Sequence, residues 1–249
     1  MLARLVADAP ENWLLKGGLA LQLRLGQRSR TTQDIDLLLV RPLPNLHKAL
    51  AQAATLDLKD WFEFEVALAV SPGVPGGGVR FLVISRLDGR AFERFHVDVG
   101  SGDPILELAD PITTPPLLAF AGLPPTQVKC YPLTQQIAKK LHAYTRPRQH
   151  GDNSRVKDLV DFLLMSEMGT FSGDVLLPAV AATFAARQTH PLPAALPLPP
   201  SAWEAPFHQQ VQALDLGYLN LHDAFRAAGA FLNPVLQQAV KGKSWQPVD

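Results

Sequence analysis

The hydrophobic and polar positions of the first hundred residues follow two spacings, one typical of helices and one typical of strands. Three segments predict helices: 1–8, 19–25 between flanking glycines, and 45–56, where apolar side chains recur every three or four residues. Four segments alternate or run continuously apolar and predict strands: 35–40, 62–70, 79–87 and 92–99. This order predicts an α+β domain with a mixed β-sheet and flanking helices.

Turn and cap residues mark the ends of these elements. Gly26 is placed to end the second helix, and Asn45 to cap the third. The sequence Leu-Asp-Gly-Arg at 87–90 predicts a hairpin between the last two strands. The segment SPGVPGGG at 71–78 predicts a turn or a loose loop.

The second half of the chain predicts helices. Proline-rich residues 109–134 form the expected boundary between the halves, with room for short helical pieces. The predicted helices are 135–144 with Thr134 as cap, 155–168 with Ser154 as cap, 172–187 interrupted or kinked at Pro178, about 207–215, and about 218–229. Residues 189–206 predict an extended proline crossover. We therefore expect a core at 1–112, a connection at 113–133 and a helical domain at 134–249.

Composition narrows the class of protein. The 249 residues are 47% hydrophobic and 18% charged, which is typical of a folded chain. One cysteine, Cys130, excludes a disulfide framework and lacks a nearby histidine for thiol catalysis. Lys and Arg equal Asp and Glu at 23 each, so net charge does not indicate a nucleic-acid partner. Neither a signal peptide nor a membrane span is evident, so we expect a soluble, cytoplasmic protein without a membrane partner.

Two aspartates, Asp34 and Asp36, stand at the start of the predicted strand 35–40. Residues i and i+2 of a strand point to the same face, so both carboxylates project together. Like charges held this close repel unless a cation lies between them. Mg²⁺ is the typical cation, because it binds one or two carboxylates together with substrate phosphates. The alternative is a pair of ordinary surface aspartates.

A glycine pair, Gly17 and Gly18, precedes the second predicted helix and follows Lys16. Free backbone N–H groups at a helix N-terminus favour an anion, and glycine lets a phosphate approach the backbone closely. Lys16 adds a positive charge at the same place. The pattern indicates a phosphate site, with a plain glycine turn as the alternative.

A third carboxylate, Asp98, lies on the same face of strand 92–99 as His96. If this strand pairs with 35–40, Asp98 joins Asp34 and Asp36. Three carboxylates around two metal ions suit nucleotidyl transfer, and Asp98 is also a candidate general base. Alternatively, Asp98 only ends its strand and caps the next turn.

The stretch 139–162 is the most basic part of the chain. Its positive side chains suit a triphosphate or RNA, although a solvated helix face is the plainer interpretation. Within it, Arg155, Asp158 and Asp161 share one face of a predicted helix. The residues expected to bind RNA are Lys139, Arg146, Arg148 and Lys157.

Several segments together resemble the AbiEii/AbiGii-type nucleotidyltransferase toxins, a group that includes the mycobacterial MenT toxins. The resemblance rests on LLKGGLALQLRLGQRSRTTQDIDL, RFHVDVGSGDP, KLHAYTRPR and SRVKDLVDF, and the proline crossover is also similar. It implies a DNA polymerase β-like nucleotidyltransferase domain followed by a helical domain that completes the active site. Two positions depart from the pattern: Gly18 stands where serine is frequent, and Lys139 where relatives are often acidic.

The resemblance also implies roles for individual residues. Catalysis falls on Asp34, Asp36, Lys140 and Asp158, with Asp34, Asp36 and Asp98 as metal ligands. Nucleotide binding falls on Lys16, Gly17, Gly18, Thr32 and Lys140, and the basic stretch adds Arg155 to them. The expected cofactor is Mg²⁺ or Mn²⁺, and the expected substrate an NTP such as ATP, CTP or GTP.

The implied function is that of a toxin in an AbiE-like toxin–antitoxin system. It would transfer NMP from an NTP to RNA, most directly the tRNA 3′ end, and so block translation. A winged-helix antitoxin encoded nearby is the expected partner. Two alternatives remain open: a nucleotidyltransferase acting on a small molecule or a protein, and a nucleotide-dependent binding or regulatory module with little turnover.

Overall fold

The computed structural model describes residues 1–68, 78–147 and 155–245, and it divides into two compact units. The first unit comprises Met1–Gln27, Thr31–Asp103 and Glu107–Pro132. The second comprises Arg28–Arg30, Pro104–Leu106 and Leu133–Asp249. The expected domain limits stay a prediction, and each unit is described by itself below.

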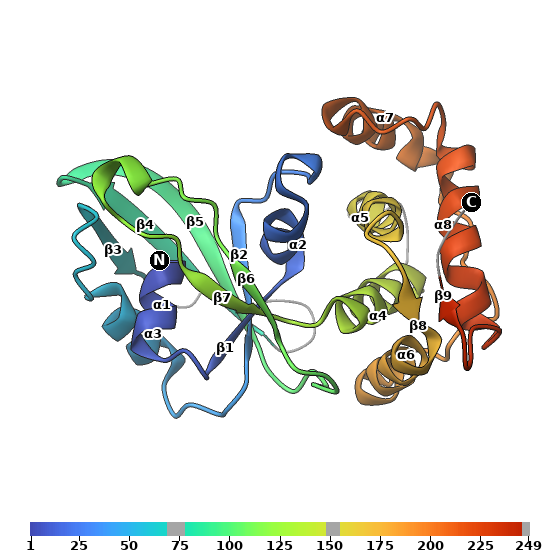
Figure 1. Ribbon diagram of the computed structural model, residues 1–249, viewed down its shortest axis with the longest axis horizontal. Helices are drawn as coiled ribbons and strands as arrows, with labels where there is room; N and C mark the ends of the chain where they lie inside the picture. The colour runs from blue at the N-terminus through green and yellow to red at the C-terminus, as the bar shows by residue number, and fades with distance from the viewer. Residues whose placement is uncertain (69–77, 148–154, 246–249) are drawn as a thin grey trace. The chain divides into compact units, whose positions relative to one another are not determined.

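The first unit is built on a mixed sheet, whose described strands run in the order β3-β4-β5-β2-β1-β7-β6 (Figure 1). Their bounds are β1 Trp13–Lys16, β2 Asp34–Leu39, β3 Phe62–Val66, β4 Val79–Leu87, β5 Arg90–Gly100, β6 Asp110–Thr113 and β7 Gln127–Cys130. Strand β2 is antiparallel to β1 and parallel to β5. This parallel pairing of β2 with β5 is the one that brings Asp98 beside the aspartates of β2.

Alternation along the strands gives the sheet two different faces. Leu15, Leu37 and Val97 point to the face that packs against the helices of this unit. Those helices are α1 Leu2–Asp8, α2 Gly17–Leu25 and α3 Leu46–Ala54, and α1 and α3 lie side by side in Figure 1. The intervening residues, among them Asp36 and Asp98, point to the opposite face. The mixed sheet with flanking helices is therefore confirmed.

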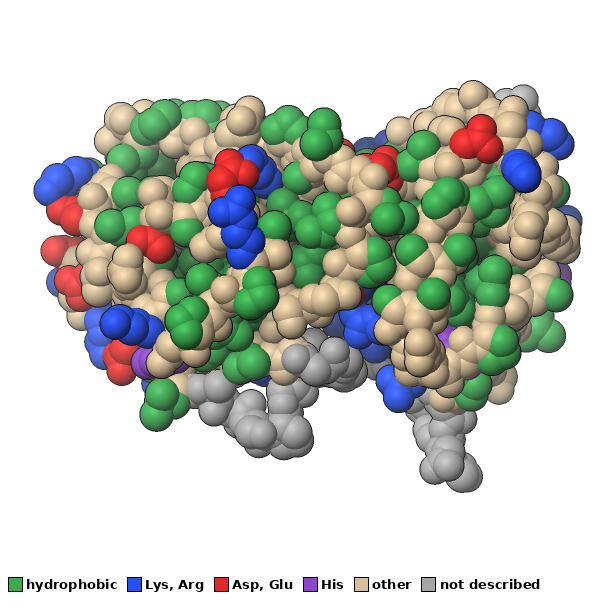
Figure 2. Space-filling view, turned by 90° about the horizontal axis from the view of Figure 1, so that it is seen from below, with side chains coloured by type: hydrophobic (Ala, Val, Ile, Leu, Met, Phe, Trp, Pro, Cys, Tyr) green, Lys and Arg blue, Asp and Glu red, His purple; other side chains and the backbone are tan. Residues whose placement is uncertain are grey.

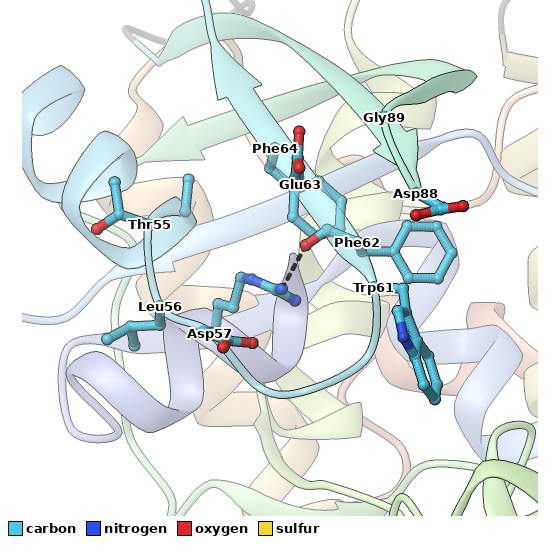
Figure 3. Close-up of a pocket in the computed structure, with 11 residues that line it drawn as sticks. Thr55, Leu56, Asp57, Trp61, Phe62, Glu63, Phe64, Asp88 and Gly89 are labelled. Atoms are coloured by element: carbon cyan, nitrogen blue, oxygen red, sulfur yellow. Dashed lines mark hydrogen bonds between the residues drawn. The ribbon is translucent and has the colours of Figure 1, made fainter.

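Arg4 fastens α1 to the edge strand β3. Its guanidinium donates two hydrogen bonds to Asp60, at 2.7 and 2.8 Å, and one to the carbonyl of Phe62 at 2.7 Å. Its Cζ lies 4.8 Å from the centre of the Phe64 ring. Figure 3 shows the bond to Phe62 at the wall of a pocket of about 440 Å³, with Trp61 beside it. Arg4 is 2% exposed, so its ion pair with Asp60 belongs to the interior of the unit.

Several expected ends match the structure. Asn45 caps α3 by accepting a hydrogen bond from the Lys48 backbone N–H at 2.9 Å. Gly26 ends α2 with a φ of +60°. The hairpin turn carries positive φ at Asp88 and Gly89, as a two-residue turn requires. The segment predicted as a loop at 71–78 lies, apart from Gly78, outside the described residues.

Other ends differ from expectation. The predicted strand 62–70 ends at Val66. Strand β1 was not predicted, because Trp13–Lys16 is a short run without alternation. The proline-rich boundary holds strands β6 and β7 and the short 3₁₀ turn η2, Ala119–Ala121. Prolines are tolerated there because the sheet ends at β6, an edge strand.

The second unit is helical, as expected. Its helices are α4 Leu133–Thr145, α5 Val156–Ser166, α6 Gly173–Arg187, α7 Glu204–Leu214 and α8 Leu221–Leu236, with a small ladder between β8 Phe171–Ser172 and β9 Ser244–Trp245. Helix α5 is the central element, because it contacts α4, α7 and α8 and is buried along most of its length. None of the helices in the described residues is long and apolar enough to cross a membrane.

Three expectations for the helices of this unit differ from the structure. Helix α6 is one continuous helix that contains Pro178, so the proline does not interrupt it, and a kink there stays a prediction. Helix α8 continues past residue 229 through Pro234. Helix α4 begins at Leu133, directly after Pro132, so Thr134 lies inside its first turn and does not cap it. The proposed cap of α5, Ser154, lies outside the described residues.

Candidate active site

A row of four charged residues crosses the sheet face opposite the helices of the first unit. Strand pairing sets Lys16 of β1 against Asp36 of β2, Asp36 against Asp98 of β5, and Asp98 against Arg80 of β4. Asp34 lies two residues before Asp36 on the same face. Two cations thus flank two central carboxylates, which is an arrangement suited to a charged substrate.

Asp36 lies directly against the backbone of Gly17. A Cβ atom added to Gly17 would lie 1.9 Å from Oδ2 of Asp36, so only glycine fits at this position. Gly17 also has a φ of +68°, which other residues rarely adopt. Helix α2 begins at Gly17, and therefore the carboxylate of Asp36 and the N-terminus of α2 lie at the same place. Gly18 is buried in the first turn of the same helix.

Lys16 reaches along the sheet to a buried partner. Its Nζ donates a hydrogen bond to Oδ2 of Asp103 at 3.1 Å. The side chain passes over Gly100, where an added Cβ would lie 2.7 Å from Nζ. The ion pair with Asp103 therefore holds Lys16 near the predicted phosphate position. The sequence did not indicate this partner.

Asp98 is engaged by Arg80 through two hydrogen bonds of 2.7 and 2.6 Å. Arg80 also lies 3.9 Å from Asp34, and His96 lies 3.3 Å from Asp34. The hydrogen bond to Asp98, together with the nearby carboxylates, raises the pKa of Arg80 above its usual range. Arg80 thus supplies the positive charge that Asp98 needs when buried, and its side chain is 41% exposed and open to a substrate.

The donors present fit a hard cation such as Mg²⁺. Among residues 1–68, 78–147 and 155–245, no group of three or more His, Cys, Asp or Glu side chains is arranged to hold a metal ion. Mg²⁺ does not need such a group, since it typically takes one or two carboxylates and completes its shell with water and phosphate. Asp34 and Asp36, on one face and partly exposed, provide that pair. A role for Asp98 as third ligand stays a prediction.

Replacing Gly17 with alanine is expected to displace Asp36 and to lower activity by about a hundredfold, because misplacement by about 1 Å costs that much. Gly26→Ala is the matched control: Gly26 also has positive φ, at +60°, but an added Cβ meets nothing within 4 Å. Both variants carry backbone strain, and only Gly17→Ala disturbs the carboxylate. Steady-state rates and melting temperatures of the two variants measure the difference; equal rates would contradict this role of Gly17.

In the second unit, Lys140 lies in a cluster of buried charges. Its Nζ donates hydrogen bonds to Asp158 at 3.2 Å and to Asp161 at 2.6 Å. Arg30 donates two hydrogen bonds to Asp161, at 3.0 and 3.1 Å, and Arg155 donates one to Asp158 at 3.0 Å. The three residues predicted to share a helix face are therefore joined by ion pairs that include Lys140.

Burial and charge act in opposite directions on this cluster. Burial disfavours the charged form of Lys140, but Asp161 and Asp158 more than offset it, and the pKa of Lys140 is raised. Burial likewise opposes ionisation of Asp161, while Lys140 and Arg30 hold its pKa below the usual value. The lysine and Asp161 are therefore both ionised at neutral pH. Catalytic roles for Lys140 and Asp158 stay a prediction.

The residues expected to bind RNA are only partly described. Arg146 and Lys157 are exposed and Lys139 is half-buried, whereas Arg148 lies outside the described residues. On the face of the molecule in Figure 2, acidic and basic side chains are interspersed, in keeping with equal numbers of both signs. Cys130 is fully buried, and burial raises the pKa of its thiol to about 11, which agrees with the absence of thiol chemistry.

His142 does not add to the positive charge of this stretch. Burial, together with His190, Arg187, Arg146 and Lys139, lowers the pKa of His142 to about 4. Its Nε2 lies 2.9 Å from the hydroxyl of Thr189, which in turn lies 2.9 Å from Nδ1 of His190. His142 is therefore neutral at pH 7, and it ties α4 to the start of the proline crossover.

This histidine predicts a pH dependence of stability. An unfolded histidine binds a proton near pH 6.5, whereas folded His142 does so only near pH 4. The stabilisation is thus complete above pH 6.5 and is lost as the pH falls toward 4. Urea unfolding at pH 7 and pH 5 is expected to show a loss of about 1–2 kcal/mol from this residue. His142→Gln should remove that part of the difference between the free energies of unfolding at pH 7 and pH 5. If the difference is the same as in the wild type, His142 is not its source.

Sequence reasoning missed Arg80, Asp103 and Arg30, and it gave Asp161 no role of its own. Arg80 lies in a largely apolar strand, and its partner depends on strand register. Asp103 and Arg30 lie in loops, where no periodicity indicates a direction for the side chain. The predicted helix placed Asp161 on one face with Arg155 and Asp158, but it did not predict that Asp161 is buried.

The family model "Nucleotidyl transferase AbiEii toxin, Type IV TA system" matches residues 1–231. The chain belongs to the AbiEii toxin family. It is accordingly a nucleotidyltransferase, and the family implies an NTP substrate and an antitoxin partner.

A solved structure supports the fold of this AbiEii toxin. The nucleotidyltransferase toxin MenT4 from Mycobacterium tuberculosis H37Rv is similar over 97% of this chain and 90% of that chain, with a TM-score of 0.53 and 16% sequence identity. The predicted fold class is thereby confirmed. A search of curated proteins with the sequence finds no match.

Proposed function

We propose that this AbiEii toxin transfers a nucleoside monophosphate from an NTP to the 3′ end of RNA, with tRNA as the expected acceptor. The observation that carries the proposal is the pair Asp34 and Asp36 on one face of β2, with Asp36 held against Gly17 at the N-terminus of α2. A triphosphate is bound by a cation that offsets its charge and by backbone N–H groups that donate to its oxygens. The two carboxylates can ligate the cation, and the N-terminus of α2 supplies the N–H groups.

The proposed reaction is an in-line displacement at the α-phosphorus. The 3′ hydroxyl oxygen of the acceptor forms the new P–O bond, its proton leaves to water, and the bond to the β-phosphate breaks to release pyrophosphate. Asp34 and Asp36 would hold Mg²⁺ or Mn²⁺, which would neutralise charge on the triphosphate. Lys16 and the amides that follow Gly17 are placed to bind the phosphates. Arg80 is exposed on the same row and is a further candidate to bind a phosphate.

The second unit provides residues whose roles remain part of the proposal. Lys140 and Arg155 are expected to bind phosphate, and Asp158 to position Lys140, as the contacts between these three side chains support. Thr32 is expected to contact the nucleotide. Lys139, Arg146, Arg148 and Lys157 are expected to bind the RNA. A winged-helix antitoxin is the expected form of the partner that the family implies.

The test is transfer of label from each of the four α-labelled NTPs to a pool of tRNA, in Mg²⁺ and in EDTA. Label on tRNA that depends on Mg²⁺ supports the proposal. Periodate oxidation of the tRNA destroys the 3′ terminal diol and should abolish labelling. Labelling of oxidised tRNA would contradict transfer to the 3′ end, and labelling only of small molecules or protein would favour a different acceptor.

A further inference from the structure

Arg80 covers the third carboxylate of the candidate active site. Its Nε donates a hydrogen bond to Oδ1 of Asp98 at 2.7 Å, and its Nη2 donates one to Oδ2 at 2.6 Å. One guanidinium therefore engages both oxygens of the carboxylate, which is the strongest geometry for such a pair. The side chain of Asp98 is 6% exposed and that of Arg80 is 41% exposed, so an exposed cation covers a nearly buried anion.

The strand register fixes this pair in place. The register of β4 against β5 shifts between Ser85 and Arg86, where Phe92 is the extra residue of a β-bulge. Beyond the bulge, Arg80 lies directly opposite Asp98. Bulges re-aim side chains and are frequent next to active sites. The contact therefore follows from the backbone, and it does not depend on the rotamer of a long surface side chain alone.

The other two carboxylates of this sheet face are more open than Asp98. The side chain of Asp34 is 40% exposed, and Asp36 is partly exposed. In the part of the chain that the structure describes, no three carboxylates, these included, are arranged to hold one ion together. An ion can therefore reach Asp34 and Asp36 from solvent, whereas it reaches Asp98 only if Arg80 moves away.

The charges of the site match a single divalent ion. Arg80 balances Asp98, and it lies 3.9 Å from Asp34 as well. Asp34 and Asp36 then carry the two negative charges that one Mg²⁺ or Mn²⁺ offsets. In two-metal sites the ions stabilise the attacking and the leaving oxygen, and arginine side chains also supply positive charge to a transferred phosphoryl group. A guanidinium can therefore provide the charge of a second ion.

We propose that Arg80 takes the place of a second metal ion at Asp98, so that the site holds one divalent ion, at Asp34 and Asp36. The inference rests on the proposed function and deepens it, because it makes Arg80 a catalytic residue that contacts the triphosphate. It differs from the expectation that Asp98 is a third metal ligand. The number of bound ions decides between the two.

The ions are counted by electron paramagnetic resonance of Mn²⁺ in the presence of an analogue of each NTP whose α–β bridging oxygen is replaced by a methylene group. Such an analogue releases no pyrophosphate, so the count needs neither RNA nor turnover. The wild type is expected to hold one Mn²⁺ per bound analogue, and Asp98→Asn the same number. Two ions in the wild type, or an ion lost in Asp98→Asn, would overturn the proposal.

Removing Arg80 should open Asp98 to metal. Arg80→Ala is expected to bind a second Mn²⁺ in excess Mn²⁺, and the double variant with Asp98→Asn should bind one. A single ion in folded Arg80→Ala would overturn the claim that Arg80 keeps a metal from Asp98. Melting temperatures show whether the variants are folded. If Arg80→Ala does not fold, the counts in the wild type and Asp98→Asn still decide the proposal.

The transfer assay tests the charge that Arg80 supplies. At the Mg²⁺ concentration that just saturates the wild type, Arg80→Ala should be about a hundred- to a thousandfold slower, the usual cost of losing one group that stabilises transition-state charge. Arg86→Ala is the matched control, because Arg86 is an exposed arginine of the same strand, and it should keep the wild-type rate. Equal rates in Arg80→Ala and the wild type would overturn the proposal.

Failure of this inference and failure of the proposed function give different results. If the wild type holds one ion but transfers no nucleotide to RNA, the proposed function fails and the single-ion site stands. If the wild type transfers nucleotide to RNA and holds two ions, the proposed function stands and the single-ion site fails.

Discussion

Asp36→Asn is expected to reduce nucleotidyl transfer by about a thousandfold, since metal-held charge stabilises such a transition state by several kcal/mol. Asparagine keeps the size of the side chain beside Gly17 but removes the negative charge. The fold should be unaffected. The substitution also relieves repulsion between neighbouring carboxylates, so the melting temperature should stay equal or rise.

Asp88→Asn provides the matched control for Asp36→Asn. Asp88 occupies the exposed turn between β4 and β5, where Asn-Gly is as favourable as Asp-Gly. This control also removes one negative charge, but it lies away from Lys16, Asp36, Asp98 and Arg80, so it should keep full activity. Transfer rates at saturating Mg²⁺ and NTP measure both variants. An active Asp36→Asn protein would remove Asp36 from the catalytic group and would favour a binding or regulatory role.

Asp161→Asn is expected to have the largest effect on stability, about 3–5 kcal/mol, because it breaks a buried ion pair from one side. The side chain of Asp161 is 0% exposed and accepts hydrogen bonds from Arg30 and Lys140. Lys140 retains Asp158 as a partner, whereas the ion pair between Arg30 and Asp161 is lost. Urea unfolding gives the free energy directly.

A surface ion pair next to Asp161 supplies its control. Glu167 pairs with Arg28, which belongs to the same short segment as Arg30, but both side chains are exposed. Glu167→Gln should therefore cost at most about 1 kcal/mol. A similar loss in both variants would contradict a buried cluster at Asp161. The stability that Asp161 contributes is present above its unfolded pKa and should decline as the pH falls below about 4.

The sequence predicted the parts of the site that depend on local geometry. Asp34 and Asp36 share a face because side chains alternate along any strand, and Gly17 stands at a helix start because its neighbours predict a helix there. The sequence did not predict that β2 pairs with β5, because the two strands are far apart in sequence. It predicted only that Asp98 lies beside Asp36 if they pair. The register of these two strands fulfils that condition.

Arg80 shows why the remainder was not predictable. The turn pairs Leu87 with Arg90, and counting seven residues along each strand sets Arg80 opposite Val97. The bulge at Phe92 adds one residue, so that Arg80 faces Asp98. A one-residue shift in register moves every side chain beyond it to the other face. The partner of Asp98 thus depends on an irregularity that the hydrophobic pattern does not reveal.

Proline inside helices was another feature that the sequence did not resolve. An interruption or kink was expected at Pro178, and helix α8 was expected to end near residue 229, yet Pro178 and Pro234 lie within the continuous helices α6 and α8. Proline lacks an N–H and clashes with the carbonyl four residues earlier, a penalty that tertiary packing can exceed. The buried side chains around them, Leu176, Val180 and Val235, supply that packing.

The most direct test of the central claim is the intact mass of a purified tRNA after incubation with the protein, Mg²⁺ and one NTP at a time. The account predicts that at least one NTP adds the mass of one or more nucleoside monophosphates to the tRNA. A label on the α-phosphate of that NTP should appear in the tRNA, and a label on its γ-phosphate should not. Asp36→Asn should abolish both the added mass and the α-phosphate label. An unchanged tRNA mass with all four NTPs would contradict transfer to tRNA. A mass gain that persists in Asp36→Asn would contradict the active site described above.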